Sequence, residues 1–109
     1  MKDLKYLPLF DAYGALLTGH QREVCELYYM CDLSLTEIAE QKGISKQSVS
    51  DTLAKSRQAL DEYEHKLRVL QTAQNMARAE ELLSAFSETH PDLAEELAEI
   101  AALLKGESL

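Results

Sequence analysis

The chain contains no tryptophan, only two prolines and only four glycines. Because proline and glycine are the strongest helix breakers, long helices are permitted over almost all of the sequence. No apolar run approaches the roughly 20 residues needed to cross a bilayer. The N-terminal segment MKDLKYLPLFDAYGALL carries acidic residues and has a helical period, unlike a signal peptide. We therefore expect a cytoplasmic protein with no membrane insertion.

Reactive and metal-binding side chains are scarce. Cys25 and Cys31 lie six residues apart on an expected helix, which puts them on different faces and prevents a disulfide between them. No histidine stands at zinc-ligand spacing from them, so both are expected to be small core or boundary residues in a reducing compartment. His20, His65 and His90 lie in separate elements, and nothing pairs them with a nucleophile. Without a glycine-rich phosphate loop either, we expect no enzyme activity and no cofactor.

The charge is strongly negative and unevenly distributed. The 109 residues are 46% hydrophobic and 28% charged, typical of a folded domain, and the net charge is −8. Residues 34–60 carry four basic and three acidic side chains, whereas residues 61–109 carry four basic and eleven acidic ones. An acidic protein repels the phosphate backbone that supplies most non-specific affinity for DNA. Charge therefore argues against a strong autonomous DNA-binding protein.

Residues 34–60, SLTEIAEQKGISKQSVSDTLAKSRQAL, have the pattern of a helix-turn-helix. Ser34 and Glu37 form a predicted capping box, Gly43 ends the first helix, and Ser45 can cap the second. Apolar residues at helical spacing complete the motif: Leu35, Ile38, Ala39, Ile44, Val49 and Leu53. Such a turn presents a second helix to the major groove of DNA. The same pattern also occurs in helical bundles that bind no DNA.

Two further helices are expected before this motif. The first follows from an apolar stripe at spacings of three and four, formed by Leu4, Leu7, Phe10, Gly14 and Leu17. Pro8 is compatible with this helix only if the helix begins near it. The second helix opens with the capping-box pair Thr18 and Gln21, and it has an apolar side formed by Val24, Leu27, Tyr28 and Cys31.

The remainder of the chain also has a helical pattern. Apolar residues continue at helical spacing from Leu60 onward, so the second motif helix either runs on without interruption or breaks near Leu60. Pro91 suits the first turn of a final helix with a narrow apolar seam, formed by Leu93, Leu97, Ile100 and Leu104. We divide the chain into a helical domain, 1–60, and an acidic extension, 61–109. The extension either packs on the same core or forms a homodimer interface, and self-association is slightly favoured.

Residues 17–67, LTGHQREVCELYYMCDLSLTEIAEQKGISKQSVSDTLAKSRQALDEYEHKL, resemble region four of the bacterial sigma-70 factors. The whole chain resembles the YlxM family of small bacterial helix-turn-helix proteins, through DAYGALLT, QREVCELYYMCDLSLTEIAE, SKQSVSD and LDEYEHKL in this order. The fold class we predict is all-α: a sigma-70 region 4-like helix-turn-helix bundle followed by a long helix and a C-terminal helical hairpin. The resemblance also implies a regulatory role tied to the signal recognition particle pathway.

The resemblance assigns DNA-binding roles to ten residues of the motif. Ser34 and Thr36 would meet backbone phosphate, and Lys42, Lys55 and Arg57 would position the protein on the backbone. The residues that would lie against base edges are Ser45, Lys46, Gln47, Ser50 and Asp51. Glutamine pairs well with adenine, lysine with guanine or phosphate, and aspartate with cytosine.

Two functions follow from these observations. The first is a DNA-binding regulator, acting as a dimer whose recognition helices occupy half-sites about one helical turn apart. The alternative is a protein-interaction module whose acidic extension binds a basic partner, such as the GTPase of the signal recognition particle. The RNA of that particle is a further candidate partner.

Overall fold

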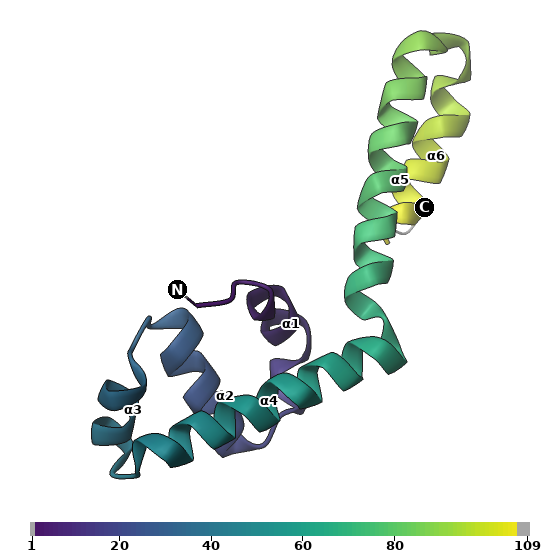
Figure 1. The fold of residues 1–109 in the computed structure, drawn as a ribbon. Helices are drawn as coiled ribbons and strands as arrows, with labels where there is room; N and C mark the ends of the chain where they lie inside the picture. The colour runs from purple at the N-terminus through teal and green to yellow at the C-terminus, as the bar shows by residue number, and fades with distance from the viewer. Residues whose placement is uncertain (1, 107–109) are drawn as a thin grey trace. The chain divides into compact units, whose positions relative to one another are not determined.

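The computed structural model describes residues 2–106, and it divides the chain into two compact units, Met1–Leu70 and Gln71–Leu109. Residues 2–106 contain helices and connecting turns but no strand, so the predicted all-α class is confirmed (Figure 1). The α-helices are α1 (Tyr6–Tyr13), α2 (Gly19–Cys25), α3 (Leu35–Lys42), α4 (Lys46–Leu67), α5 (Val69–Thr89) and α6 (Ala94–Leu104). The domain boundary expected after residue 60 and the packing of residues 61–109 stay predictions.

α1 begins at Tyr6, so Pro8 lies in the first turn, where a missing N–H costs little. The predicted apolar stripe of this helix was only partly right. Leu9 and Tyr13, which the stripe left out, are the buried residues of α1, whereas Leu4 lies before the helix and is 66% exposed. Leu7 and Phe10 are half-buried, whereas Gly14 and Leu17, at and after the 3₁₀ turn Gly14–Leu16, are buried as expected, so the predicted stripe lies at the edge of the buried face of α1.

α2 carries the predicted capping box: the Thr18 hydroxyl accepts from the N–H of Gln21, and the Gln21 side chain accepts from the N–H of Thr18. The predicted apolar side fails further along. Val24 is fully buried as expected, but Cys31 is exposed, and Tyr29 takes the inward position. The cause is a π-helical turn, Glu26–Met30, which inserts an extra residue per turn and rotates the following side chains.

Both cysteines are free thiols, as the sequence predicted. Cys25 is fully buried in the core of the first unit, and this burial raises the pKa of its thiol. Cys31 lies at the surface, so the expected core or boundary position is correct for Cys25 and wrong for Cys31.

The core of the first unit forms around α4. The buried residues of α4, Val49, Leu53, Ser56 and Leu60, follow one another at spacings of four, three and four. The hydroxyl of Ser56 donates to the carbonyl of Thr52 at 2.7 Å, which satisfies a polar group inside the core. Against this face pack the other buried residues, Leu9, Tyr13, Leu17, Val24, Cys25, Tyr29, Ile38 and Ala39.

α4 runs without interruption past Leu60 and ends at Leu67, which answers the question that the sequence left open. Arg68, the next residue, has a φ of 54° and so turns the chain through the left-handed region. The first amide groups of α5 still belong to the first unit and are capped within it: the Tyr13 hydroxyl accepts from the N–H of Val69 at 2.9 Å, and Glu64 accepts from the N–H of Leu70 at 3.1 Å. Tyr13 also donates to Glu64.

The second unit contains the helical hairpin that the sequence predicted. α5 and α6 are joined by a 3₁₀ turn, Pro91–Leu93, with Pro91 in its first turn as expected. The ring of His90 stacks on that of Phe86, with centroids 3.9 Å apart, at the C-terminal end of α5. None of the described residues of this unit, 71–106, is buried.

Candidate nucleic-acid interface

α3 is the first helix of the motif, and its ends form as predicted. The Ser34 hydroxyl accepts from the N–H of Glu37 at 3.1 Å, and the Glu37 carboxylate accepts from the N–H of Ser34 at 3.1 Å. Gly43 ends the helix with a φ of 68°, a conformation in which glycine carries no steric cost. The N–H of Ile44 then donates to the carbonyl of Ala39 at 3.0 Å, which closes the turn.

α4 is the second helix of the motif, and Ser45 caps it by accepting from the N–H of Ser48 at 3.0 Å. Ile38 and Ala39 of α3 lie buried in the same core as Val49 and Leu53 of α4. The small side chain of Ala39 allows two backbones to approach closely at such a turn. The predicted helix-turn-helix is therefore present in full.

The first turns of α4 carry exposed polar side chains. Lys46, Gln47 and Asp51 are exposed, and Gln47 Nε2 donates to Asp51 Oδ1 at 2.9 Å, one helical turn further on. Asp51 thereby holds the amide of Gln47 in one orientation, with the amide oxygen of Gln47 left available as an acceptor. Asp51 therefore has a hydrogen-bond partner on α4, although its negative charge would repel the phosphates of DNA.

The structure distributes the ten predicted residues over several environments. Ser34 and Ser45 are exposed helix caps, and Ser50 is half-buried. The other exposed members are Thr36, Lys46, Gln47, Asp51 and Lys55. Lys42 is half-buried and pairs with Glu23 of α2, with Nζ and Oε2 2.5 Å apart. The ammonium group of Lys42 lowers the pKa of Glu23. The contact of these residues with DNA stays a prediction.

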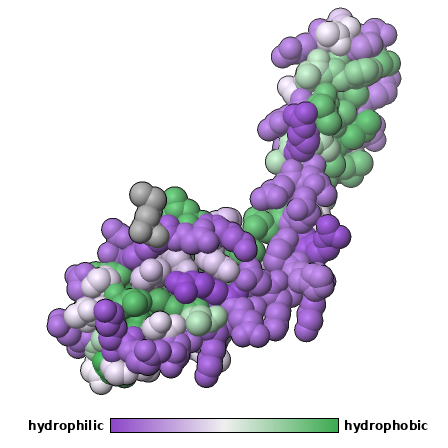
Figure 2. All heavy atoms as spheres, viewed as in Figure 1, coloured by the Kyte–Doolittle hydropathy of each residue, from purple (hydrophilic) through white to green (hydrophobic). Residues whose placement is uncertain are grey.

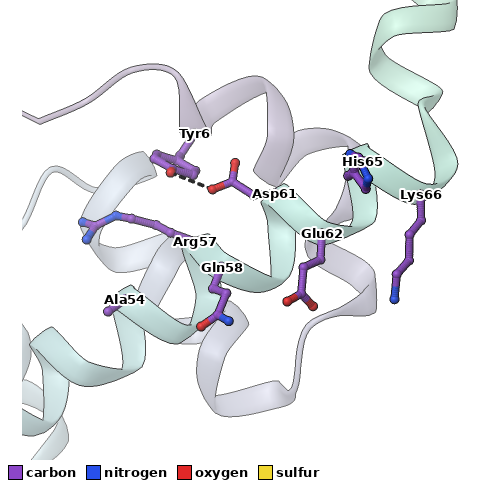
Figure 3. A pocket seen from close by; sticks show the side chains of 8 residues that line it. All are labelled: Tyr6, Ala54, Arg57, Gln58, Asp61, Glu62, His65 and Lys66. Atoms are coloured by element: carbon purple, nitrogen blue, oxygen red, sulfur yellow. Dashed lines mark hydrogen bonds between the residues drawn. The ribbon is translucent and has the colours of Figure 1, made fainter.

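Arg57 lies in a cluster of tyrosines. Its Nε donates to the Tyr29 hydroxyl at 2.8 Å, and its guanidinium carbon lies 5.7–6.0 Å from the ring centres of Tyr6, Tyr28 and Tyr29. Figure 3 shows Arg57 and Asp61 on α4 beside Tyr6, whose hydroxyl donates to Asp61 at 3.0 Å. Eleven residues of helix, about 16 Å, separate Arg57 from Lys46. The structure therefore does not bring Arg57 together with the first turns of α4.

Lys2 is a positioning residue that the sequence did not reveal. Its ammonium group donates to the carbonyls of Tyr28 and Leu33 at 2.6 and 2.7 Å, and it lies 3.2 Å from Asp32 Oδ1. These three bonds fix the chain immediately before Ser34, where the motif begins. The partners lie more than 25 residues away in sequence, so no local pattern could have predicted the contact.

A cavity of about 540 Å³ lies beside α4 in the first unit, away from the first turns of the motif. Its lining combines apolar carbon with both signs of charge: Tyr6, Ala54, Arg57, Gln58, Asp61, Glu62, His65 and Lys66. Over residues 2–106 the structure contains no cluster of three or more histidine, cysteine, aspartate or glutamate side chains able to hold a metal ion. No helix in this described range is long and apolar enough to span a membrane.

Comparison with known proteins agrees with this geometry. The sequence model of UPF0122, "Putative helix-turn-helix protein, YlxM / p13 like", matches residues 1–102. The chain belongs to the UPF0122 family. UPF0122 proteins of Bacillus cereus (strain AH187), Bacillus anthracis (strain A0248) and Bacillus thuringiensis subsp. konkukian (strain 97-27) are each 38% identical to it over 97 residues. The match covers 89% of this chain and 88% of each relative. The resemblance to the YlxM family is confirmed. The family's description refers to a helix-turn-helix, which is the motif formed by α3 and α4.

We predict that the α3 capping box is acid-sensitive. The bonds from Ser34 lower the pKa of Glu37, so the ionised carboxylate stabilises the fold above the unfolded-state pKa, and this contribution is lost as the pH falls through the folded-state value. Glu37→Gln keeps a capping box, because glutamine also accepts from Ser34, but it cannot titrate. Urea unfolding midpoints between about pH 3 and pH 6 should fall less steeply for Glu37→Gln than for the wild type. Parallel pH profiles would contradict this account.

Proposed function

We propose that the first unit binds double-stranded DNA through the N-terminal turns of α4 and acts as a regulator. The observation that carries this proposal is a complete helix-turn-helix whose second helix presents Lys46 and Gln47, exposed, at its N-terminal end. In helix-turn-helix proteins this end of the second helix meets the base edges in the major groove. Membership of a helix-turn-helix family supports the same function.

Each exposed side chain has a chemistry suited to one part of DNA. The Gln47 amide, held by Asp51, could bond adenine in the major groove, and Lys46 could reach guanine or a phosphate. Ser34, Thr36 and Lys55 would contact the backbone, and Ser45 and Ser50 would lie against the base edges. Lys42 and Arg57 have partners within the chain, so we expect smaller contributions from them. Two copies would place two α4 helices on half-sites about one helical turn apart.

The negative net charge sets the conditions under which binding should occur. At −8 the chain as a whole repels DNA, so the local cations of the motif must act at short range. We expect weak non-specific affinity, with specific binding strongest at low salt. Each lysine–phosphate contact should contribute a slope of about −0.9 to the logarithm of affinity against the logarithm of salt concentration.

The proposal predicts that Lys46→Ala and Gln47→Ala each weaken specific DNA binding. The full chain is mixed with sheared genomic DNA at low ionic strength, the retained fragments are sequenced, and the enriched site is titrated. Each variant should lose about 1–3 kcal/mol at that site. Gln47→Ala should relax the preference at one base pair, whereas Lys46→Ala, if it meets phosphate, should weaken all sequences alike and reduce the salt slope by about one unit.

Lys66→Ala is the matched control, because Lys66 is also exposed on α4 but lies twenty residues from Lys46. This variant should bind the enriched site as the wild type does. No enrichment of any motif, or equal losses for Lys46→Ala and Lys66→Ala, would overturn the assignment of the first turns of α4.

The excess of acidic side chains in the second unit favours a second candidate function. Residues 71–109 carry two basic and eight acidic side chains, which suits a basic protein partner. The YlxM resemblance points to the signal recognition particle GTPase or its RNA, and either role would place the protein in the cytoplasm. Saturable binding to the GTPase or the RNA, together with no retention of DNA, would favour this candidate over the first.

A further inference from the structure

The second unit exposes six large apolar side chains among its described residues, and we call the five that remain when Met76 is set aside the apolar face. Its members are Leu82 and Phe86 on α5, Leu93 in the connecting turn, and Ile100 and Leu103 on α6, with exposed fractions of 36–62%. Figure 2 shows hydrophobic side chains gathered along this hairpin. Proteins that act alone rarely expose a contiguous apolar patch, and such patches mark interaction sites.

The apolar face occupies one side of the hairpin. A cavity of about 690 Å³ opens on the other side, lined from both helices mostly by small and charged side chains, among them Ala77, Ser84, Glu88, Ala98 and Lys105. Helical spacing separates the two sets of residues: Leu82 and Phe86 share one side of α5, whereas Ala77 and Ser84 share another. The two sides of the hairpin therefore differ in chemistry.

The hairpin lacks the usual means of stabilising so small a unit. None of its residues from 71 to 106 is buried, and units of about 40 residues usually need disulfides, metals or oligomerisation. Both cysteines lie in the first unit, and the described residues hold no candidate metal cluster. A partner that covers the apolar face would supply the stabilisation that disulfides or metals give to other units of this size.

We propose that this partner is a second copy of the chain, docked apolar face to apolar face to form a four-helix bundle. A two-fold axis brings the two identical faces together, so the apolar side chains of one copy pack against the apolar side chains of the other. The second unit's two basic and eight acidic side chains exclude nucleic acid and anionic lipid as occupants. On α5 the glutamates Glu80, Glu81 and Glu88 line the cavity side, so a basic protein bound to them would leave Phe86 exposed.

The charge gives this association a characteristic dependence on salt. Two acidic hairpins repel each other across solvent, and salt screens that repulsion without weakening the apolar contact. Dimerisation should therefore become tighter as the salt concentration rises, whereas binding to DNA or to a basic partner should become weaker. The proposal does not depend on DNA binding, because the apolar face and the first turns of α4 are separate sets of residues.

The test is sedimentation equilibrium of the full chain from about 0.05 to 0.5 M salt. The wild type should have twice the mass of one chain at micromolar concentration, with a dissociation constant that falls as salt is added. Phe86→Glu should raise this constant by about 30-fold or more, as expected for an aromatic anchor. Ser84→Glu adds the same charge to the same helix on the cavity side, and should change the constant by less than about 3-fold.

A second variant guards against loss of the hairpin fold in Phe86→Glu. Leu103 is 62% exposed, so Leu103→Gln should leave the helical content unchanged while weakening the dimer. A wild type that is monomeric at about 100 μM, equal effects of Phe86→Glu and Ser84→Glu, or a dissociation constant that rises with salt would each overturn the proposal. Affinity for a single DNA half-site should be unchanged in Phe86→Glu, so the two proposals fail independently.

Discussion

Leu60→Ala should lower the free energy of unfolding of the first unit by about 3–5 kcal/mol. Leu60 is fully buried on α4, where its side chain packs in the core that α1, α2 and α3 share. Truncation to alanine removes the transfer free energy of the lost methyl and methylene groups, and it leaves a cavity that a rigid helix cannot close. Such a loss is a large part of the stability of an ordinary domain.

Leu67→Ala is the matched control for this substitution. Leu67 lies two helical turns further along α4, and it is 54% exposed. The same chemical change there should cost less than about 1 kcal/mol. Chemical denaturation followed by circular dichroism measures the free energy of unfolding of both variants. Similar losses for Leu60→Ala and Leu67→Ala would contradict the burial of Leu60 in the core.

Gly43→Ala should destabilise the helix-turn-helix by about 1–2 kcal/mol. Gly43 has a φ of 68°, and a Cβ added there would meet no atom within 4 Å. The cost is therefore one of backbone conformation alone, because an L-residue in the left-handed region brings its Cβ close to its own backbone. The turn between α3 and α4 depends on this residue, so affinity for DNA should decline with stability.

Gly19→Ala provides a control of opposite sign. Gly19 also has open space around the position of a Cβ, but it lies in α2 without a positive φ. Alanine there should stabilise the protein by about 0.4–1 kcal/mol, chiefly because it restricts the unfolded chain. Thermal or urea unfolding should therefore move in opposite directions for the two substitutions. A stabilising Gly43→Ala would show that the turn does not need a left-handed residue.

The parts of the fold that local chemistry decides could be predicted from the sequence. Ser34, Gly43 and Ser45 cap helix ends through backbone groups within a few residues of themselves. The ends of α3 and the start of α4 could therefore be predicted from the residue types. Pro91 at the start of the final turn belongs to the same class of signal. For the same reason, the exposed position of Lys46 and Gln47 on α4 could be foreseen.

Where the helical period changes, the prediction failed. The π-helical turn Glu26–Met30 shifts the side chains of its own segment, so Tyr29 faces the core where the spacing favoured Tyr28 and Cys31. Periodicity analysis assumes 3.6 residues per turn throughout, and no single residue type marks this departure. Burial in the tertiary core selects it.

The sequence by itself determined the all-α class, the helix-turn-helix and the acidic character of the C-terminal part of the chain, because each depends on composition or on bonds between near neighbours. Only the tertiary structure decided where α4 ends, since Arg68 turns the chain and Tyr13, 56 residues before Val69, caps the next helix. It also decided that Arg57 lies among tyrosines and that Lys42 pairs with Glu23. These are long-range contacts, and a chain reveals them only once packing has brought distant segments together.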